Sequence, residues 1–168
     1  YEATENQEHK FSFFSSPITN TTPSKTFNLS DAHEYIISHK ASNATELFRS
    51  MKDKEYAKEF KIKNFDYVTF SGTFTNRNDK NLTSYSNLIC FDFDKLENIE
   101  EAKKLLCNDP YFDTQLLFVS PSGNGLKWVI HNPLHQSAHQ DFFNAVANYL
   151  STTYSLKVDM SGKDISRA

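Results

Sequence analysis

The sequence YSNLICFDFD, residues 85–94, is the strongest strand pattern in the chain. Residues i and i+2 of a strand point to the same face. Asp92 and Asp94 therefore share one face, whereas Phe91 and Phe93 fill the other. The stretch predicts a buried strand that carries a pair of carboxylates at its end.

Further helix and strand patterns lie on both sides of this strand. Apolar residues at helical spacing predict a helix that begins near Ser30 and Asp31, and further helices over 43–58, 98–107 and 136–153. Strands are expected over 66–74, 114–119 and 126–130, and the start of a last strand at 156–158. These elements predict an α+β domain in which a mixed or largely antiparallel sheet is covered by helices.

The chain divides into a short polar segment and one domain. Residues 1–28 are polar and interrupted by Pro17 and Pro23, which predicts a poorly structured segment, with a short edge strand over 11–14 as the alternative. Residues 29–168 are expected to form a single domain. Hydrophobic residues make up only 38% of the 168 residues but aromatic residues 14%, so aromatic side chains supply the bulk of the core.

Charge and cysteine content exclude several classes of protein. The net charge of −3 excludes a protein that coats nucleic acid through bulk electrostatics, so a polyanion would need a local groove. Two cysteines cannot make a disulfide scaffold or a zinc cage. No signal peptide and no run of 18 apolar residues is visible. We therefore expect a cytoplasmic protein that does not interact with membranes.

The carboxylate pair has a specific chemical use. Two like charges on one face of a strand repel each other unless a cation lies between them. Hard oxygen ligands favour Mg²⁺ or Mn²⁺ over zinc. Asp92 and Asp94 are therefore candidate metal ligands; the alternative is a strand end whose carboxylates are solvated or paired with lysines.

A glycine-containing turn leads into the next candidate residue. The chain has only four glycines, where average usage would give about twelve, so each is expected to meet a backbone requirement. In SPSGNGLK, residues 120–127, Gly123 and Gly125 allow backbone N–H groups to face an anion beside Ser122, and Lys127 adds an ammonium. The segment lacks the spacing of a P-loop. The alternative is a plain hairpin with a solvated lysine.

A third candidate motif is VDMSGKDISR, residues 158–167. Asp159 follows an apolar residue and would supply a third carboxylate for a two-metal site. Arg167 lies eight positions later and is a candidate to hold a triphosphate or a sugar. The alternative is a loop with a local ion pair between Asp164 and Arg167.

Taken in order, these three motifs resemble those of the archaeo-eukaryotic primase superfamily, the catalytic fold of primases and primase-polymerases. Its motifs are a D-x-D/E pair, a small-residue-x-His strand and an apolar residue followed by Asp. The surrounding sequence is similar to the VirE N-terminal domain family, which occurs beside helicase-like domains in bacterial mobile elements. The similarity covers roughly residues 65–168 and rests on SGTFTNR (71–77), CFDFD (90–94), SPSGNGLKWVI (120–130) and DMSGKDISRA (159–168).

The resemblance implies a primase-polymerase-like domain with a modified, RRM-like sheet. It implies two Mg²⁺ or Mn²⁺ ions held by the catalytic residues Asp92, Asp94 and Asp159. The implied reaction is nucleotidyl transfer from an NTP or dNTP, on a DNA or RNA template, in the replication of a bacterial mobile element. The implied partner is a helicase-like domain on the same or a neighbouring chain. The family pattern also implies a further strand after residue 168.

One position departs from this superfamily and leaves a second function open. Lys127 stands where the superfamily usually has His. A lysine binds a phosphate as a point charge without the directional, neutral contact of an imidazole. The alternative is a catalytically inactive nucleotide- or single-strand-binding module attached to a helicase-like domain.

Two further interpretations complete the sequence-based expectations. Arg77 is a candidate contact for template or nucleotide, with a surface turn as its alternative. A nucleotide-sugar glycosyltransferase would also use D-x-D and Mn²⁺, but the chain offers little room for an acceptor domain. A phosphatase of the D-x-D-x-[TV] type is disfavoured because Lys95 and Leu96 follow the pair.

Overall fold

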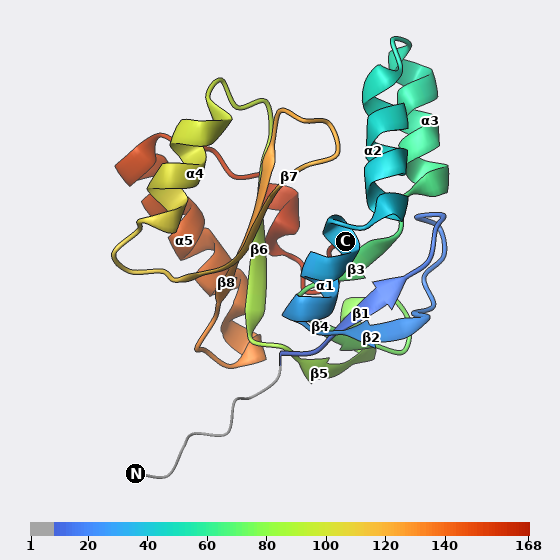
Figure 1. Cartoon of the computed structure of the whole chain (residues 1–168). Coiled ribbons are helices and arrows are strands. Elements are labelled where there is room, and N and C mark those ends of the chain that lie inside the picture. The colour runs from blue at the N-terminus through green and yellow to red at the C-terminus, as the bar shows by residue number, and fades with distance from the viewer. Residues whose placement is uncertain (1–8) are drawn as a thin grey trace.

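Three small antiparallel sheets and five α-helices build the protein in a computed structural model that describes residues 9–168 (Figure 1). The sheets have the strand orders β2-β1-β3, β4-β5 and β6-β8-β7. The strands are β1 (Phe11–Phe14), β2 (Lys25–Phe27), β3 (Tyr67–Thr69), β4 (Gly72–Phe74), β5 (Leu82–Tyr85), β6 (Leu88–Phe93), β7 (Thr114–Val119) and β8 (Leu126–His131). The helices are α1 (Leu29–Ile36), α2 (His39–Ser50), α3 (Lys54–Asn64), α4 (Ile99–Cys107) and α5 (His139–Tyr154), with short 3₁₀ turns η1 (Asp79–Asn81), η2 (Gln136–Ala138) and η3 (Met160–Lys163).

The strand expected at 85–94 is β6, an edge strand that pairs with β8, and β8 in turn pairs with β7. Strand alternation divides the side chains of this sheet between two cores. Ile89, Phe91, Phe93 and Trp128 point to the side covered by α4 and α5. The other face packs on β1, β2 and α1, so the β6-β8-β7 sheet lies between two layers and is called the central sheet below (Figure 1). The α+β class is confirmed, and three separate antiparallel sheets form where one mixed or largely antiparallel sheet was expected.

The expectation of a poorly structured segment over 1–28 is wrong for residues 9–28; residues 1–8 lie outside the described part of the chain. All four residues of β1 are buried, and β1 is the middle strand of its sheet, not an edge. Phe13 stacks on Phe27 with ring centroids 4.4 Å apart. The aromatic side chains of β1 therefore make this segment part of the core.

The first helices differ from the expected ones in their boundaries. Asn28, rather than Ser30, caps α1, in a reciprocal capping box with Asp31. The single helix expected over 43–58 is a hairpin of two helices, because the chain breaks at 51–53 and Asp53 caps α3. The exposed fraction of Leu47 in α2 is 52%, so its side chain is not part of the core.

The last expected strand does not form. Residues 156–158 leave α5 without regular structure and lead into η3. The Asp159 N–H nevertheless donates to the Asp92 carbonyl oxygen at 2.8 Å, so the segment lies beside the end of β6. Within residues 9–168 no helix is long and apolar enough to cross a bilayer.

The place of β1 in the core can be tested by mutation. Phe11 is fully buried, and Phe11→Ala is expected to lower the free energy of unfolding by about 3–5 kcal/mol. Ile37, whose exposed fraction is 68%, is the matched control, and Ile37→Ala is expected to change it by less than ~0.5 kcal/mol. Urea unfolding measures both variants. Equal effects would show that β1 is not part of the cooperative core.

Candidate functional site

An ion pair between neighbouring strands forms the centre of the site. Asp92 of β6 and Lys127 of β8 are direct cross-strand partners. Lys127 Nζ donates to Asp92 Oδ1 at 2.6 Å. The exposed fractions of the two side chains are only 26% and 17%, so water screens the pair weakly. The sheet therefore presents a fixed cation and a fixed anion on its face opposite α4 and α5.

The surroundings keep Lys127 charged and a nearby thiol neutral. Burial alone would lower the pKa of Lys127, but the charge and the hydrogen bond of the Asp92 carboxylate help to raise that pKa above its ordinary value. Burial, and secondarily Asp92, raises the pKa of the Cys90 thiol to about 12. Cys90 is therefore a neutral thiol at physiological pH, which excludes it as a nucleophile.

Asp159 lies beside this pair. Its carboxylate caps η3 by accepting hydrogen bonds from the Ser161 hydroxyl at 2.7 Å and the Ser161 N–H at 3.0 Å. These bonds, and secondarily the charges of Arg167 and Lys127, hold the pKa of Asp159 below its ordinary value. Arg167 approaches the other carboxylate oxygen at 3.9 Å. The partner of Arg167 is therefore Asp159, not the Asp164 that the sequence suggested.

A pocket of about 200 Å³ opens next to these charges. The charged residues that line it are Asp66, Asp92, Lys127, Asp164 and Arg167, and aromatic side chains make much of the rest of its walls. The wall residues come from both halves of the fold: Phe13, Phe27, Tyr35, Phe65, Phe70 and Phe118. The pocket thus joins charged groups to apolar walls, which is the usual composition of a small-molecule site.

The glycine turn between β7 and β8 is built for close packing. A Cβ on Gly125 would collide with the Phe93 carbonyl oxygen, so only glycine allows this approach to β6. Gly123 has φ +84° and its N–H donates to the Ser120 carbonyl. Neither glycine, nor the exposed Ser122, lines the pocket, whereas Lys127 does.

Arg49 of α2 is a residue that sequence reasoning missed. It donates to the carbonyl oxygens of Pro121 at 2.9 Å and Ser120 at 3.2 Å. Its guanidinium lies against Gly123, where a Cβ would be 3.3 Å from Nε. Because 72 positions separate Arg49 from Pro121, no local pattern indicates this contact. It ties the helical hairpin to the turn that leads into Lys127.

The structure brings together only part of the predicted metal site. Asp92 and Asp159 lie on adjacent segments, whereas Asp94 is exposed after the end of β6. Among the residues from 9 onward, no three His, Cys, Asp or Glu side chains are grouped closely enough to hold a metal ion. The carboxylate oxygens suit Mg²⁺ or Mn²⁺. Asp92 is held by the Lys127 ammonium, which a metal ion would have to displace.

Arg77 lies elsewhere. The Arg77 guanidinium is 5.0 Å from the ring centroid of Tyr67, and the backbone N–H of Arg77 donates to the Thr21 carbonyl oxygen. Tyr67 in turn stacks on Phe14. Arg77 therefore fixes the β4–β5 loop against the N-terminal segment, and it does not line the pocket beside Asp92.

A second buried polar network surrounds His139, at the start of α5. Asn132 donates to the Tyr85 hydroxyl, which lies 2.7 Å from His139 Nδ1. The Tyr85 hydroxyl proton is thus available to His139 Nδ1, which leaves the ring proton on Nε2. Nε2 is buried and has no hydrogen-bond partner among the described residues. Burial lowers the pKa of His139 to about 4, although Asp79 and Asp164 act in the opposite direction.

Comparison with known proteins gives one family match. The family model described as "BT4734-like, N-terminal domain" matches residues 60–168. This range contains all the carboxylates of the site, Lys127 and Arg167, but not β1, β2, α1 or α2. No curated protein and no solved structure matches.

The strength of the central ion pair can be measured by a double-mutant cycle. Asp92→Asn and Lys127→Met are each expected to destabilise the fold by about 1–3 kcal/mol, because each leaves a largely buried charge without its partner. The double variant is expected to lose less than the sum, with a coupling of at least ~1 kcal/mol. The matched control is the exposed pair Lys63–Glu59, whose coupling is expected to stay below ~0.5 kcal/mol. Equal couplings would contradict the role given to the central pair.

His139 predicts a specific dependence of stability on pH. Its pKa is about 4 in the folded chain and near 6.5 when unfolded, so between these values the unfolded chain binds more protons. The free energy of unfolding is therefore expected to fall by up to ~3 kcal/mol from this group as pH drops from 6.5 to 4.

His139→Gln is expected to flatten the pH dependence in that window, as measured by urea unfolding at several pH values. The control is His33→Gln at an exposed position in α1. An unchanged slope in the His139 variant would show that this histidine does not titrate as described.

Proposed function

The chain belongs to the BT4734-like N-terminal domain family, and on this premise we propose that it is a metal-dependent nucleotidyltransferase domain of the primase-polymerase type. The observation that carries the proposal is that three distant motifs meet beside one pocket, which Asp92, Lys127 and Arg167 line while Asp159 lies outside its lining. Asp92, Lys127 and Asp159 come from separate parts of the chain and adjoin one another, with Arg167 beside them. Their order matches that of the primase superfamily motifs.

The cations of the site suit a triphosphate. Lys127 and Arg167 both line the pocket, and Arg167, with an exposed fraction of 48%, can reach an incoming phosphate. Arg167 offers a planar set of N–H donors, whereas Lys127 acts as a point charge. The aromatic walls offer apolar surface to a base or sugar. We therefore assign an NTP or dNTP to this pocket.

The proposed metal ligands are Asp92, Asp94 and Asp159. A bound Mg²⁺ or Mn²⁺ would offset triphosphate charge and lower the pKa of an attacking hydroxyl. The protein's own part is to release Asp92 from Lys127 so that the ammonium can turn to a phosphate. A DNA or RNA template, a helicase-like partner domain and a role in mobile-element replication belong to the same proposal, through the resemblance to the primase superfamily and the VirE N-terminal family.

The second candidate is a binding module without catalysis. The 2.6 Å bond between Lys127 and Asp92 favours it, because the pair neutralises a carboxylate that a metal would need. Such a module would bind a nucleotide or a single strand without metal and without turnover. The two functions differ in whether nucleotide affinity depends on Mn²⁺.

Calorimetric titration with a dNTP, with and without Mn²⁺, tests the proposal. Wild type is expected to bind in Mn²⁺, and Asp92→Asn and Asp159→Asn are each expected to lose at least about 10-fold in affinity, because second-shell changes already cost that much at metal sites. Asp113→Asn, at an exposed position before β7, is the matched control and is expected to bind like wild type.

Titration with Mn²⁺ alone adds a sharper comparison. Lys127→Met is expected to bind Mn²⁺ more tightly than wild type, since it frees the Asp92 carboxylate. Nucleotide binding that is independent of Mn²⁺ and of both carboxylates, with no primer extension, would replace the enzyme with the binding module. No nucleotide binding under either condition would overturn the enzyme, and a chain that binds neither a nucleotide nor a single-stranded oligonucleotide would overturn both.

A further inference from the structure

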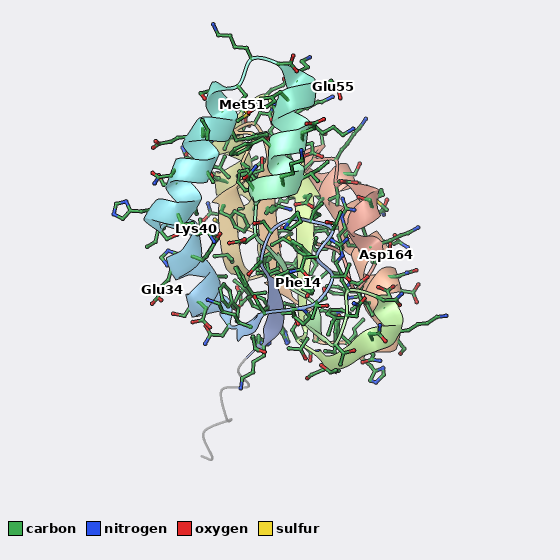
Figure 2. The ribbon with its side chains drawn as sticks, turned by 90° about the vertical axis from the view of Figure 1, so that its right-hand side faces the viewer. Phe14, Glu34, Lys40, Met51, Glu55 and Asp164 are labelled. Carbon is green, nitrogen blue, oxygen red and sulfur yellow. The ribbon has the colours of Figure 1, made fainter. Side chains whose placement is uncertain are left out.

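The helical hairpin of α2 and α3 stands at the periphery of the molecule. Neither helix has a fully buried residue. Met51 and Glu55 mark the outer end of the hairpin, away from the central sheet (Figure 2). The side chains of α3 are therefore mostly available to a partner, and their charges are not needed to fill a core.

The hairpin is basic although the chain is acidic. Residues 49–64 contain six Lys or Arg and three Asp or Glu, whereas the rest of the chain contains twelve and eighteen. Positive charge is thus concentrated on one projecting element of a protein whose net charge is −3. A polyanion would be attracted to this element and repelled by most of the remaining surface.

Three lysines form a row along α3. Lys54, Lys58 and Lys61 are spaced i, i+4 and i+7, so they share one face and span about 10 Å of helix. All three are exposed, and in the described structure none is ion-paired, whereas Lys63 on another face pairs with Glu59 at 3.8 Å. The row therefore presents three uncompensated charges in a line, which suits successive phosphates of a backbone.

The α2 side of the hairpin lies against the site, from Ala41 near its base to Arg49 near its outer end. Arg49 binds the Pro121 and Ser120 carbonyls, and Pro121 lines the pocket that contains Lys127. Ala41 and Thr45 of α2 line the same pocket. A strand that follows the hairpin would therefore arrive at the mouth of the proposed nucleotide site.

We propose that the α2–α3 hairpin is a docking surface for the phosphate backbone of single-stranded nucleic acid, with the row Lys54, Lys58 and Lys61 as its main contact. This rests on the proposed function, in which a template reaches the nucleotide pocket. The surface lies almost wholly in residues 39–61, most of which precede the family-matched range. It adds a contact that the site motifs do not supply.

The test is fluorescence anisotropy of a labelled single-stranded oligonucleotide over a series of salt concentrations. Replacement of all three lysines by Gln is expected to weaken binding at low salt by at least about 10-fold. It is also expected to reduce the slope of log K against log salt by about 2, because each phosphate contact contributes about 0.7. Replacement by Arg is expected to keep the wild-type slope, since Arg retains the charge.

The matched control replaces Lys95, Lys104 and Lys157 by Gln. Lys104 lies in α4, Lys95 in the loop before α4 and Lys157 in the segment after α5; all three are exposed, and their loss changes the net charge equally. The helices α4 and α5 cover the face of the central sheet opposite the pocket (Figure 1). The control is expected to retain the wild-type affinity and slope. Equal weakening by the two triple variants would overturn the proposal, as would wild-type chain that binds no oligonucleotide.

Titration of the same variants with a dNTP separates this inference from the proposed function. The hairpin variant is expected to bind dNTP like wild type, because none of its lysines lines the pocket. If the hairpin variant binds dNTP normally and its oligonucleotide affinity keeps the wild-type dependence on salt, the docking surface alone is overturned. Loss of dNTP binding in wild type would overturn the proposed function, whatever the oligonucleotide result.

Discussion

The pairing of β6 with β8 is the constraint on which the rest of the arrangement depends. It sets Asp92 opposite Lys127 and, on the reverse face, Phe91 opposite Trp128. A shift of one residue in this register would exchange the two faces, placing charges against α5 and aromatic rings in the pocket. The apolar face is therefore what holds the charged face in place. Gly125 permits the close approach of the two strands at the end of the pair.

The fold places its charges at a junction of two layers. The central sheet contributes Asp92 and Lys127, the C-terminal segment contributes Asp164 and Arg167, and the N-terminal strands and α1 contribute aromatic walls. The matched family range supplies the charged groups, and the preceding residues supply much of the apolar surface. Charge chemistry and pocket shape thus come from different parts of the chain.

Sequence patterns predicted the local elements well and the long-range contacts poorly. The strand expected over 114–119 is β7, and the helix expected over 98–107 is α4 with Asn98 as its cap, because both are encoded by local periodicity and local caps. The sequence did not predict β1 as a core strand, because its four residues are all buried and show no alternation of buried and exposed side chains. Its partner β3 also lies more than fifty positions away. The adjacency of Asp92 and Asp159 was expected from motif order alone. The contact of Arg49 had no signal in the sequence, since it joins a helix side chain to distant carbonyls.

The burial of Cys90 divides the two cysteines into different chemical classes. Cys90 lines the pocket, and its high pKa leaves almost no thiolate to react with an alkylating reagent or with peroxide. Cys107 is exposed at the end of α4, on the far side of the central sheet from the pocket. The unaltered chain therefore offers one readily labelled thiol, at a place remote from the proposed chemistry. Modification of the other thiol would report the opening of the pocket itself.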